Sequence, residues 1–461
     1  MSSSPSPEKL TSLEVRATAG LAGIYGLRML GMFIILPVFA FYAEHLPGGN
    51  NYTLVGIALG AYGLTQAILQ VPFGWMSDRI GRKPVIYMGL ILFAAGSFVA
   101  AAATDIYWVI AGRVIQGAGA ISAAVMALAA DLTREEHRTK AMAAIGMTIG
   151  ATFALSLVIA PVLNRLIGVP GIFAMTGVLA LLAMAVAARV VPDPSDSRFH
   201  SDTEASPGGF YKVLRDPQLL RLDFGVFVLH AVLMALWLAV PLSLRQAGLA
   251  ADDHWHVYLP VLLLSMAMVI PAIIYGEKKA KLKQVFVLAV AVLLVSQLML
   301  EFLADSLWGA TAALLVFFAA FNLLEATLPS LISKIAPVGA KGTAIGVYSS
   351  VQFLGAFVGA SAGGYLYQHY GSAALFGFCG GLVALWLVLA ATMKAPAAVR
   401  TRMYHVPEMD TDRASGLSRQ LATLVGVHEA KVLASEGVAY LKVDMKGFDE
   451  QGVAQLLGGE A

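Results

Sequence analysis

The sequence contains twelve long apolar stretches, separated by short polar breaks. An α-helix needs about 20 apolar residues to cross the roughly 30 Å hydrocarbon core of a bilayer. The stretches lie at 16–44, 53–77, 84–103, 106–130, 141–165, 170–190, 218–246, 256–276, 284–303, 308–334, 342–368 and 371–393. The sequence therefore predicts an all-α membrane protein with twelve transmembrane helices, surrounded by the lipid bilayer.

The composition agrees with this class and excludes others. Of the 461 residues, 58% are hydrophobic and only 13% are charged, whereas a soluble domain carries about 25% charged residues. The single cysteine, Cys379, excludes a disulfide scaffold. A formal net charge of +2 gives no basis for binding nucleic acid.

The basic residues of the loops predict the orientation. Nearly all lysines and arginines outside the spans fall on alternate loops and at the two ends of the membrane region, while the other loops hold only Arg165 and Arg245. The positive-inside rule places the basic set, and both termini, in the cytoplasm. The segment before Arg16 contains acids and no short apolar core with a cleavage site, so we expect an uncleaved first span.

A segment rich in Pro, Ser and Gly at 191–217 divides the membrane region into two six-helix halves, 1–190 and 218–393. We interpret it as a flexible cytoplasmic linker. The halves also resemble each other, because Ala144-Ile145-Gly146 recurs as Ala344-Ile345-Gly346. Two like-oriented halves suit a transporter in which they rock about a site at mid-membrane.

The short loop after the second stretch carries the most specific motif. Residues 74–84 read GWMSDRIGRKP, and the residues of the motif are Gly74, Asp78, Arg79, Gly81, Arg82 and Lys83. Gly74 lets another helix approach closely, and Gly81 can supply a tight turn. Asp78 can pair with a basic neighbour or with a helix N-terminus. The alternative interpretation is an ordinary basic loop that only sets the orientation.

This loop resembles the signature of the major facilitator superfamily, and two further stretches are similar to its proton-coupled antiporter branch. Residues 110–120, IAGRVIQGAGA, resemble the fourth-span motif with its intramembrane arginine, here Arg113. Residues 146–161 resemble the fifth-span antiporter motif, with Gly146, Gly150 and Pro161 in place. The sequence departs from that motif at Ala160, where a glycine is expected, and at Asn164-Arg165, where a glycine pair is expected.

The resemblance covers about 14–393 and implies a multi-pass protein of the bacterial inner (plasma) membrane. It also implies that the loop motif braces an outward-open state. Carried over to this chain, Asp78 would contact the start of the eleventh helix, while Arg82 and the pair Asp131/Arg134 complete a charge network. The alternative is that Asp131 and Arg134 only cap a helix end.

Ionisable residues inside the spans are the candidates for a proton and substrate cavity, since a charge at the bilayer centre costs about 3 kcal/mol on the insertion scale. They are Arg28, Arg113 and Glu325. Glu325 is interpreted as the only carboxylate well inside a span, and it shares a helical face with Asn322. Proton and substrate can compete for such a carboxylate. The alternative is a permanent ion pair between Glu325 and Arg28 or Arg113.

Three more polar residues complete this set. His230 in the seventh span can titrate near neutral pH or can be a hydrogen-bonded packing residue. Gln66 and Gln70, one turn apart, face the cavity or bond across helices. Protons are the expected coupling ion, with no organic cofactor and no metal. The sequence contains no Walker loop, no H-E-x-x-H and no Cys/His cluster, so an enzyme is not expected.

Residues 394–461 have the composition of a small soluble domain with a linker. Their strand–helix–strand–strand–helix pattern predicts a ferredoxin-like α+β domain in the cytoplasm. The stretch 424–444 resembles heavy-metal-associated domains, but the absence of cysteine excludes thiolate metal capture. Regulation, self-association and binding of a soluble partner stay open as roles.

The sequence as a whole predicts a secondary active transporter. The first hypothesis is a proton-driven antiporter that exports a small amphipathic compound. The second is a proton-coupled importer or facilitator of a metabolite, with a regulatory C-terminal domain. A third, from another class, is a membrane sensor whose output is that domain.

Overall fold

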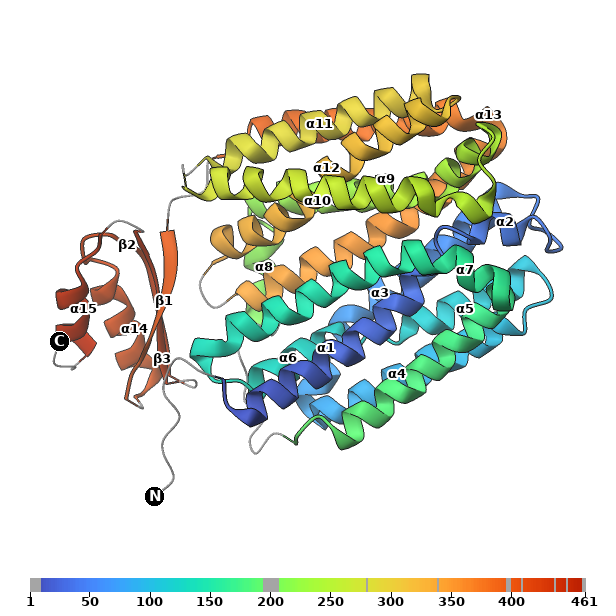
Figure 1. Ribbon diagram of the computed structural model, residues 1–461. Helices are drawn as coiled ribbons and strands as arrows, with labels where there is room; N and C mark the ends of the chain where they lie inside the picture. The colour runs from blue at the N-terminus through green and yellow to red at the C-terminus, as the bar shows by residue number, and fades with distance from the viewer. Residues whose placement is uncertain are drawn as a thin grey trace.

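The computed structural model describes residues 10–193, 207–278, 281–337, 340–394, 399–407, 409–434, 437–444 and 447–457. They form a bundle of long helices with a small α+β domain beyond one end (Figure 1). We call the end next to that domain, which also carries the 74–84 loop, the basic end. The other end, where the short helix α2 (Phe39–Ala43) lies, is the opposite end.

The first half of the membrane region comprises α1 (Ser12–Phe33), α2, α3 (Tyr52–Ile80), α4 (Arg82–Ala101), α5 (Ile106–Ala118), α6 (Ser122–Asp131) and α7 (Glu135–Arg189). Helix α7 contains two spans. Between them Gly168 adopts φ 67° and ψ 172°, which turns the chain back. Glycine reaches this region without the steric cost that other residues meet.

The second half follows the same plan. It comprises α8 (Pro207–Val213), α9 (Pro217–Gln246), the 3₁₀ turn η1 (Ala251–Asp253), α10 (Trp255–Lys278), α11 (Leu282–Leu303), α12 (Leu307–Ile335) and α13 (Lys341–Ala391). Helix α13 again contains two spans, which turn at Gly371. When α7 and α13 are divided at these glycines, the described residues contain the twelve expected spans in two groups of six.

Three predicted boundaries need correction. The first stretch, predicted as one helix at 16–44, breaks after Phe33 because Pro37 cannot donate a backbone hydrogen bond. The fourth stretch, predicted as one helix at 106–130, breaks between Ala118 and Ser122. The predicted flexible linker contains the short helix α8, while its residues 194–206 lie outside the described part of the chain.

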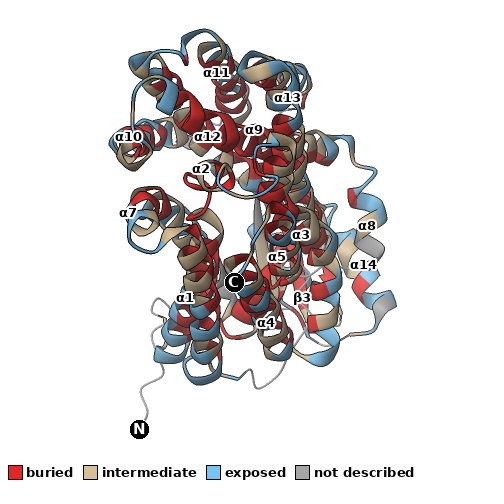
Figure 2. Ribbon diagram, turned by 90° about the vertical axis from the view of Figure 1, so that its right-hand side faces the viewer, coloured by how far each residue is buried: buried red, intermediate tan, exposed pale blue. Residues whose placement is uncertain are grey.

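Buried residues face the interior of the helical region (Figure 2). Helices α3 and α13 pack closely against each other across the two halves. A Cβ atom on Gly56 would lie 2.1 Å from the carbonyl oxygen of Ala360, and one on Gly364 would lie 2.3 Å from that of Tyr52. Small residues permit such backbone contact between membrane helices, so these glycines fix the two halves together toward the opposite end.

The C-terminal domain confirms the predicted order of elements. It comprises β1 (Val399–His405), α14 (Thr411–Leu421), β2 (Val427–Leu433), β3 (Val438–Asp444) and α15 (Glu450–Leu457). The strands form an antiparallel sheet in the order β1-β3-β2. Lys442 of β3 donates a hydrogen bond to the carbonyl oxygen of Ala336, at the end of α12, and thereby joins this domain to the helices.

Candidate functional site

Contacts between the two halves close the opposite end. Glu44 accepts two hydrogen bonds from Arg245, at 2.7 and 2.8 Å. Arg165 forms an ion pair with Asp252 at 3.1 Å. Arg165 is one of the departures from the antiporter motif, and in this chain its ion pair helps to close the opposite end.

A cavity of about 460 Å³ lies between the halves at the basic end. First-half residues in its lining include Tyr25, Gln70, Gly74, Trp75, Asp78, Ser122, Met126, Met142 and Gly146. Residues from the rest of the chain in the lining include Phe210, Gly342, Ile345, Gly346 and Ser349. The structure therefore has its opposite end closed and a hollow between the halves at its basic end.

The glycines of the fifth span are free of contact in this form. A Cβ atom added to Gly146 or Gly150 would meet nothing within 4 Å, and the same holds for Gly346. Gly146 and Gly346 both line the cavity, whereas Gly56 at the other end is tightly packed. These positions leave room for the halves to approach at the basic end.

Pro161, the third residue of the predicted fifth-span motif, lies inside α7, within the same span as Gly146 and Gly150.

The loop motif is organised around Arg82, whose side chain is buried. Its guanidinium donates to Asp78, to Ser77 at 3.0 Å and to Asp131 at 3.2 Å. Among the described residues Arg82 is the partner of Asp78, while Gly342 at the start of the eleventh span lies elsewhere in the lining of the same cavity. In this form Asp78 contacts a residue of its own loop, and its expected contact with the eleventh span in the outward-open state stays a prediction.

The other loop residues have separate contacts. Gly81 adopts φ 99° and makes the expected tight turn. The guanidinium of Arg79 lies 3.6 Å from the centre of the Trp75 ring. Lys83 donates to the carbonyl oxygen of Val191 at 2.7 Å and thus ties the loop to the end of the first half.

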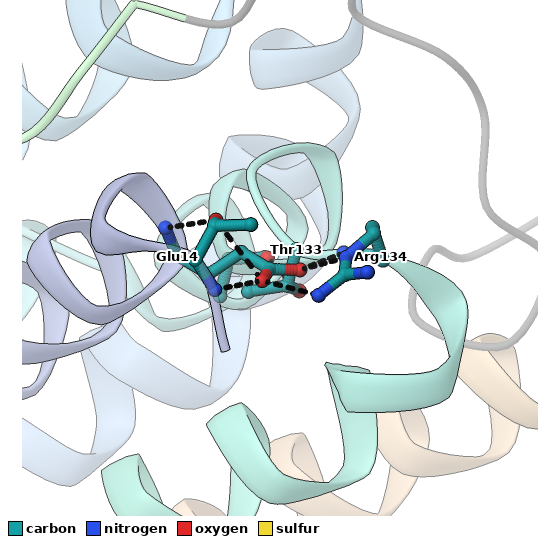
Figure 3. Close-up of polar contacts among 5 residues, drawn as sticks. Glu14, Thr133 and Arg134 are labelled. Carbon is teal, nitrogen blue, oxygen red and sulfur yellow. Dashed lines mark hydrogen bonds and ion pairs between the residues drawn. The ribbon is translucent and has the colours of Figure 1, made fainter. Parts of the chain in front are cut away.

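Arg134 pairs with Glu14, a residue that the sequence did not single out (Figure 3). The Nε of Arg134 lies 3.0 Å from Glu14 Oε1, and the backbone N–H of Arg134 donates to the same oxygen at 2.9 Å. Burial acts to raise the pKa of the Glu14 carboxyl, but hydrogen bonds from Arg134 and Thr11 outweigh it and lower the pKa to about 2. Asp131 thus binds Arg82, and Arg134 binds Glu14. The signal was present, because Thr11 and Glu14 form a capping box.

The two intramembrane arginines are buried in the first half. Arg28 donates to the Tyr62 hydroxyl at 2.7 Å and to the Ser122 hydroxyl at 3.2 Å. Arg113 donates to Gln116 at 2.7 Å. Both guanidinium groups lie near the Tyr62 ring, at 5.9 and 5.1 Å from its centre. Within the described residues neither arginine has a carboxylate at ion-pair distance, so the expected alternative of an ion pair with Glu325 does not form.

The two glutamines differ in their surroundings. The Gln66 amide donates to the Tyr62 hydroxyl at 3.3 Å and to the carbonyl oxygen of Gly119 at 3.4 Å. It thus bonds across helices. Gln70 lines the cavity, and its Oε1 has no hydrogen-bond partner among the described residues.

Glu325 lies beside His230 in the second half. The two side chains approach to 3.7 Å between Glu325 Oε2 and His230 Nε2. The Glu325 side chain is 40% exposed overall, while its Oε2 is buried and has no hydrogen-bond partner among the described residues. Asn322 does not join this pair, because its amide donates to Ser265 at 3.1 Å.

His230 is held by two further contacts. Its Nδ1 lies 3.2 Å from the carbonyl oxygen of Val226, so this nitrogen carries a hydrogen. Its Nε2 lies 2.7 Å from the side-chain nitrogen of Gln352 on α13. The histidine therefore connects α9, α12 and α13.

The sequence reasoning missed Asp223 on α9. This carboxylate is 5% exposed, and its Oδ1 has no hydrogen-bond partner within the described residues. Asp223 and His230 are seven residues apart, which places them on one helical face. The hydroxyl group of Tyr348 on α13 lies close enough to the carboxyl groups of Asp223 and Glu325 to interact with them electrostatically. An aspartate just inside the seventh predicted span was the available signal, and Glu325 is not the only intramembrane carboxylate.

Comparisons with known proteins agree with this architecture. The Major Facilitator Superfamily model matches residues 21–282 and 224–414. The chain is 45% identical over 438 residues to the inner membrane transport protein YajR of Escherichia coli (strain K12), covering 95% of this chain and 96% of that protein. It is 27% identical over 355 residues to the quinolone resistance protein NorA of Staphylococcus aureus (strain MRSA252), covering 74% and 87%.

A solved structure shows the same fold at lower identity. It is a bacterial homolog of the human lysosomal transporter Spinster, in an inward-facing and occupied conformation. The TM-score is 0.69 at 13% identity, covering 83% of this chain and 96% of that chain. Within the described residues, no group of three or more His, Cys, Asp or Glu side chains could hold a metal ion.

Proposed function

Because the chain belongs to the major facilitator superfamily of membrane transporters, we propose that it is a proton-coupled antiporter that exports a small amphipathic compound across the bacterial inner membrane by alternating access. The loop charges make the basic end cytoplasmic. On this assignment the structure is an inward-open form, with the cavity reached from the cytoplasm.

The observation that carries the proposal is the contact of His230 with Glu325 and Gln352. In the neutral ring Nδ1 holds the hydrogen, so Nε2 accepts from the Gln352 amide. A proton on Nε2 turns the 3.7 Å approach to Glu325 into an attraction between opposite charges. Protonation thus changes which helices the histidine holds together, and that is the requirement for a proton to bias two conformations.

The glycine contacts support alternation between two forms. The opposite end is already packed, with Gly56 and Gly364 against the backbone of the other half. At the basic end, Gly146 and Gly346 have open space beside them in the cavity wall. Rocking the halves would fill the space at one end while opening the other.

The direction of transport rests on the antiporter motif and on the relative named for quinolone resistance. One observation favours the second candidate, a proton-coupled importer or facilitator of a metabolite. Arg165 stands where the antiporter motif has glycine, and it is engaged with Asp252 across the two halves. The transport assay below separates the two candidates.

The test uses Glu325→Gln in proteoliposomes, with a substrate chosen from compounds that raise the unfolding temperature of the purified protein. The variant keeps the shape of the side chain and removes the negative charge to which a protonated His230 would be attracted. Exchange of labelled for unlabelled substrate should persist, since it does not require proton release. Accumulation driven by an imposed pH gradient should vanish, because a proton on His230 then no longer changes which helices this residue holds together.

Glu301→Gln is the matched control, because it makes the same chemical change on α11, outside the His230 contact. It should accumulate substrate like the unmodified protein. Full gradient-driven accumulation by a folded Glu325→Gln protein would refute the coupling role. Accumulation in the direction of proton flow would favour the importer.

The C-terminal domain has a contact that favours a regulatory role. Lys442 of β3 donates to the carbonyl oxygen of Ala336, where α12 ends. The same helix carries Glu325. Deletion of the residues after 395 should leave transport intact and alter its regulation, and transport with unchanged regulation would argue against this role.

A further inference from the structure

We propose that the cavity at the basic end binds the acidic head group of an amphipathic organic anion, with the Ser122 hydroxyl as the contacting donor and the Arg28 charge behind it. The inference builds on the proposed transport function by naming a substrate class. It concerns binding alone, so it can be tested without a proton gradient.

The charge balance around the cavity favours an anion. Arg28 is 1% exposed and Arg113 is 2% exposed, and guanidinium groups stay charged in proteins. Within the described residues neither has a carboxylate at ion-pair distance. A buried charge without an opposite charge is unfavourable, so an anion in the cavity would offset a cost that the free protein carries.

Ser122 is placed to donate a hydrogen bond into the cavity. Its oxygen accepts the hydrogen bond from Arg28, which leaves its own O–H free to donate, and the residue lies in the cavity wall. A hydroxyl that accepts from a guanidinium becomes a stronger donor, because neighbouring hydrogen bonds polarise one another. Ser122, polarised by the buried arginine, can therefore donate a stronger hydrogen bond to an anionic ligand.

The break in the fourth span places a helix N-terminus at the cavity. Ser122 is the first residue of α6, and no side chain caps this helix end. The positive end of the helix dipole and the N–H groups of the first turn favour an anion there. Ser122 and Ala123 both line the cavity, so this end of α6 is open to it. Half-helices inside membrane transporters hold anionic groups in this way.

A fourth, independent observation is Gln70 on α3. The residue is 4% exposed and lines the cavity, while its Oε1 lacks a hydrogen-bond partner among the described residues. A buried polar atom without a partner is costly. A ligand that presents a donor beside its acid group, or a water held by it, would satisfy this oxygen.

The rest of the lining suits an apolar body rather than a cation. Met126, Met142 and Ile145 supply apolar surface, and methionine adapts to varied shapes. Asp78 is the one charged residue among the described residues in the lining, and Arg82 neutralises it. Asp223 and Glu325 are outside this lining. The wall therefore lacks a free negative charge that would hold a cation.

The test compares three ligands that share one aromatic body. They are naphthalene-2-sulfonate, the neutral naphthalene-2-sulfonamide and the cation 2-naphthylmethylammonium. Equilibrium dialysis uses the full chain in nanodiscs of zwitterionic lipid, with empty nanodiscs subtracted and no pH gradient. We expect the anion to bind at least about tenfold more tightly than either of the others.

Two variants locate the site. Ser122→Ala keeps Arg28 in place and should weaken binding of the anion about fivefold while leaving the neutral ligand unchanged. Arg28→Gln should remove the preference for the anion altogether. Ser296→Ala is the control, because it removes another buried hydroxyl, on α11 and outside the cavity lining. It should bind all three ligands like the unmodified protein.

Equal affinity for the three ligands, or preference for the cation, would overturn the proposal. So would an anion preference that survives Ser122→Ala undiminished, which also decides the matter if Arg28→Gln does not fold. Anion binding without gradient-driven transport would refute the proposed antiport and leave this inference standing. Proton-coupled transport of a cation would do the reverse.

Discussion

The two halves share one helical plan and differ in the charges they bury. Among the described residues of the first half, Arg28 and Arg113 lie inside the membrane region without a carboxylate partner. The second half instead buries Asp223 and places Glu325 beside His230. The halves keep equivalent glycines, such as Gly146 and Gly346, which face the same cavity. The equivalent glycines leave room for the two halves to move, whereas the different buried charges determine what each half can bind.

This difference indicates which half binds the proton and which half binds the substrate in the proposed mechanism. A proton needs a group that titrates, and carboxylates and histidine provide it. Arginine does not release its proton in proteins. The second half is therefore suited to carry the proton, and the first half is suited to attract the substrate. Substitutions in each half test this division.

The largest effect should come from Arg82→Ala. Arg82 is a buried arginine of the first half that does have carboxylate partners, Asp78 and Asp131. Removing one member of a buried ion pair typically costs about 3–5 kcal/mol, so the unfolding temperature should fall sharply. Arg28→Met should leave it unchanged or raise it, because Arg28 lacks such a partner. If both variants lose the same stability, the contrast between partnered and unpartnered arginines is wrong.

The next effect concerns the pair of Glu14 with Arg134. Glu14→Gln should destabilise the basic end by about 2 kcal/mol, since charge-assisted hydrogen bonds are lost. The folded pKa of about 2 lies below the ordinary value of 4.5. Its stabilisation is therefore complete above about pH 4.5 and disappears as the pH falls toward 2. Unfolding of both proteins between pH 3 and 7 should show their difference shrinking at low pH, and a constant difference would contradict the pairing.

A smaller effect is expected for Asp78→Asn. Asp78 is 27% exposed in its side chain and lines the cavity, so the protein should fold nearly as before. Transport should fall at least about tenfold, on the order of 1.4 kcal/mol of lost preference between states. Transport rates in proteoliposomes measure this, with Arg79→Ala, which removes a stacking contact on Trp75, as the comparison. Unchanged transport by a correctly inserted Asp78→Asn protein would exclude the conformational role.

The smallest effect on stability should come from equivalent glycines of the two halves. Gly146→Ala and Gly346→Ala have open space in this form, and each should change the unfolding free energy by less than about 1 kcal/mol. Both should slow transport, because the added methyl groups obstruct closure of the basic end. Gly56→Ala should instead destabilise this form, since its Cβ would lie 2.1 Å from a carbonyl oxygen. Different responses of Gly146 and Gly346 would show that the halves do not move as equivalents.

The fold was largely predictable from the sequence, because apolar length and loop charge are local signals. The twelve spans and the order of strands and helices in the C-terminal domain follow from them. The helix breaks at Pro37 and Gly119 depend on single residues, so the apolar length of a stretch does not predict them. The turn at Gly168 falls between two predicted spans, 141–165 and 170–190, so its position was predicted.

The candidate site was less predictable, because partners on different helices are not local. The sequence showed Glu325 and two arginines but not that Glu325 lies beside His230, since this depends on how α9 and α12 face each other. It also ranked Glu325 as the buried carboxylate, whereas Asp223 is the more buried one. Arg134 was paired with Asp131 by proximity in the chain, while Glu14, far away in sequence, is a partner in the structure.

Whether a proton carried by the second half moves against the substrate can be measured directly. Proteoliposomes are loaded with substrate and a pH-sensitive dye, with the same pH on both sides, and are then diluted. Antiport predicts that the lumen becomes acidic as the substrate leaves, whichever way the protein is inserted, and that Glu325→Gln abolishes this change. A lumen that becomes alkaline, or substrate that leaves at constant pH, would contradict the account.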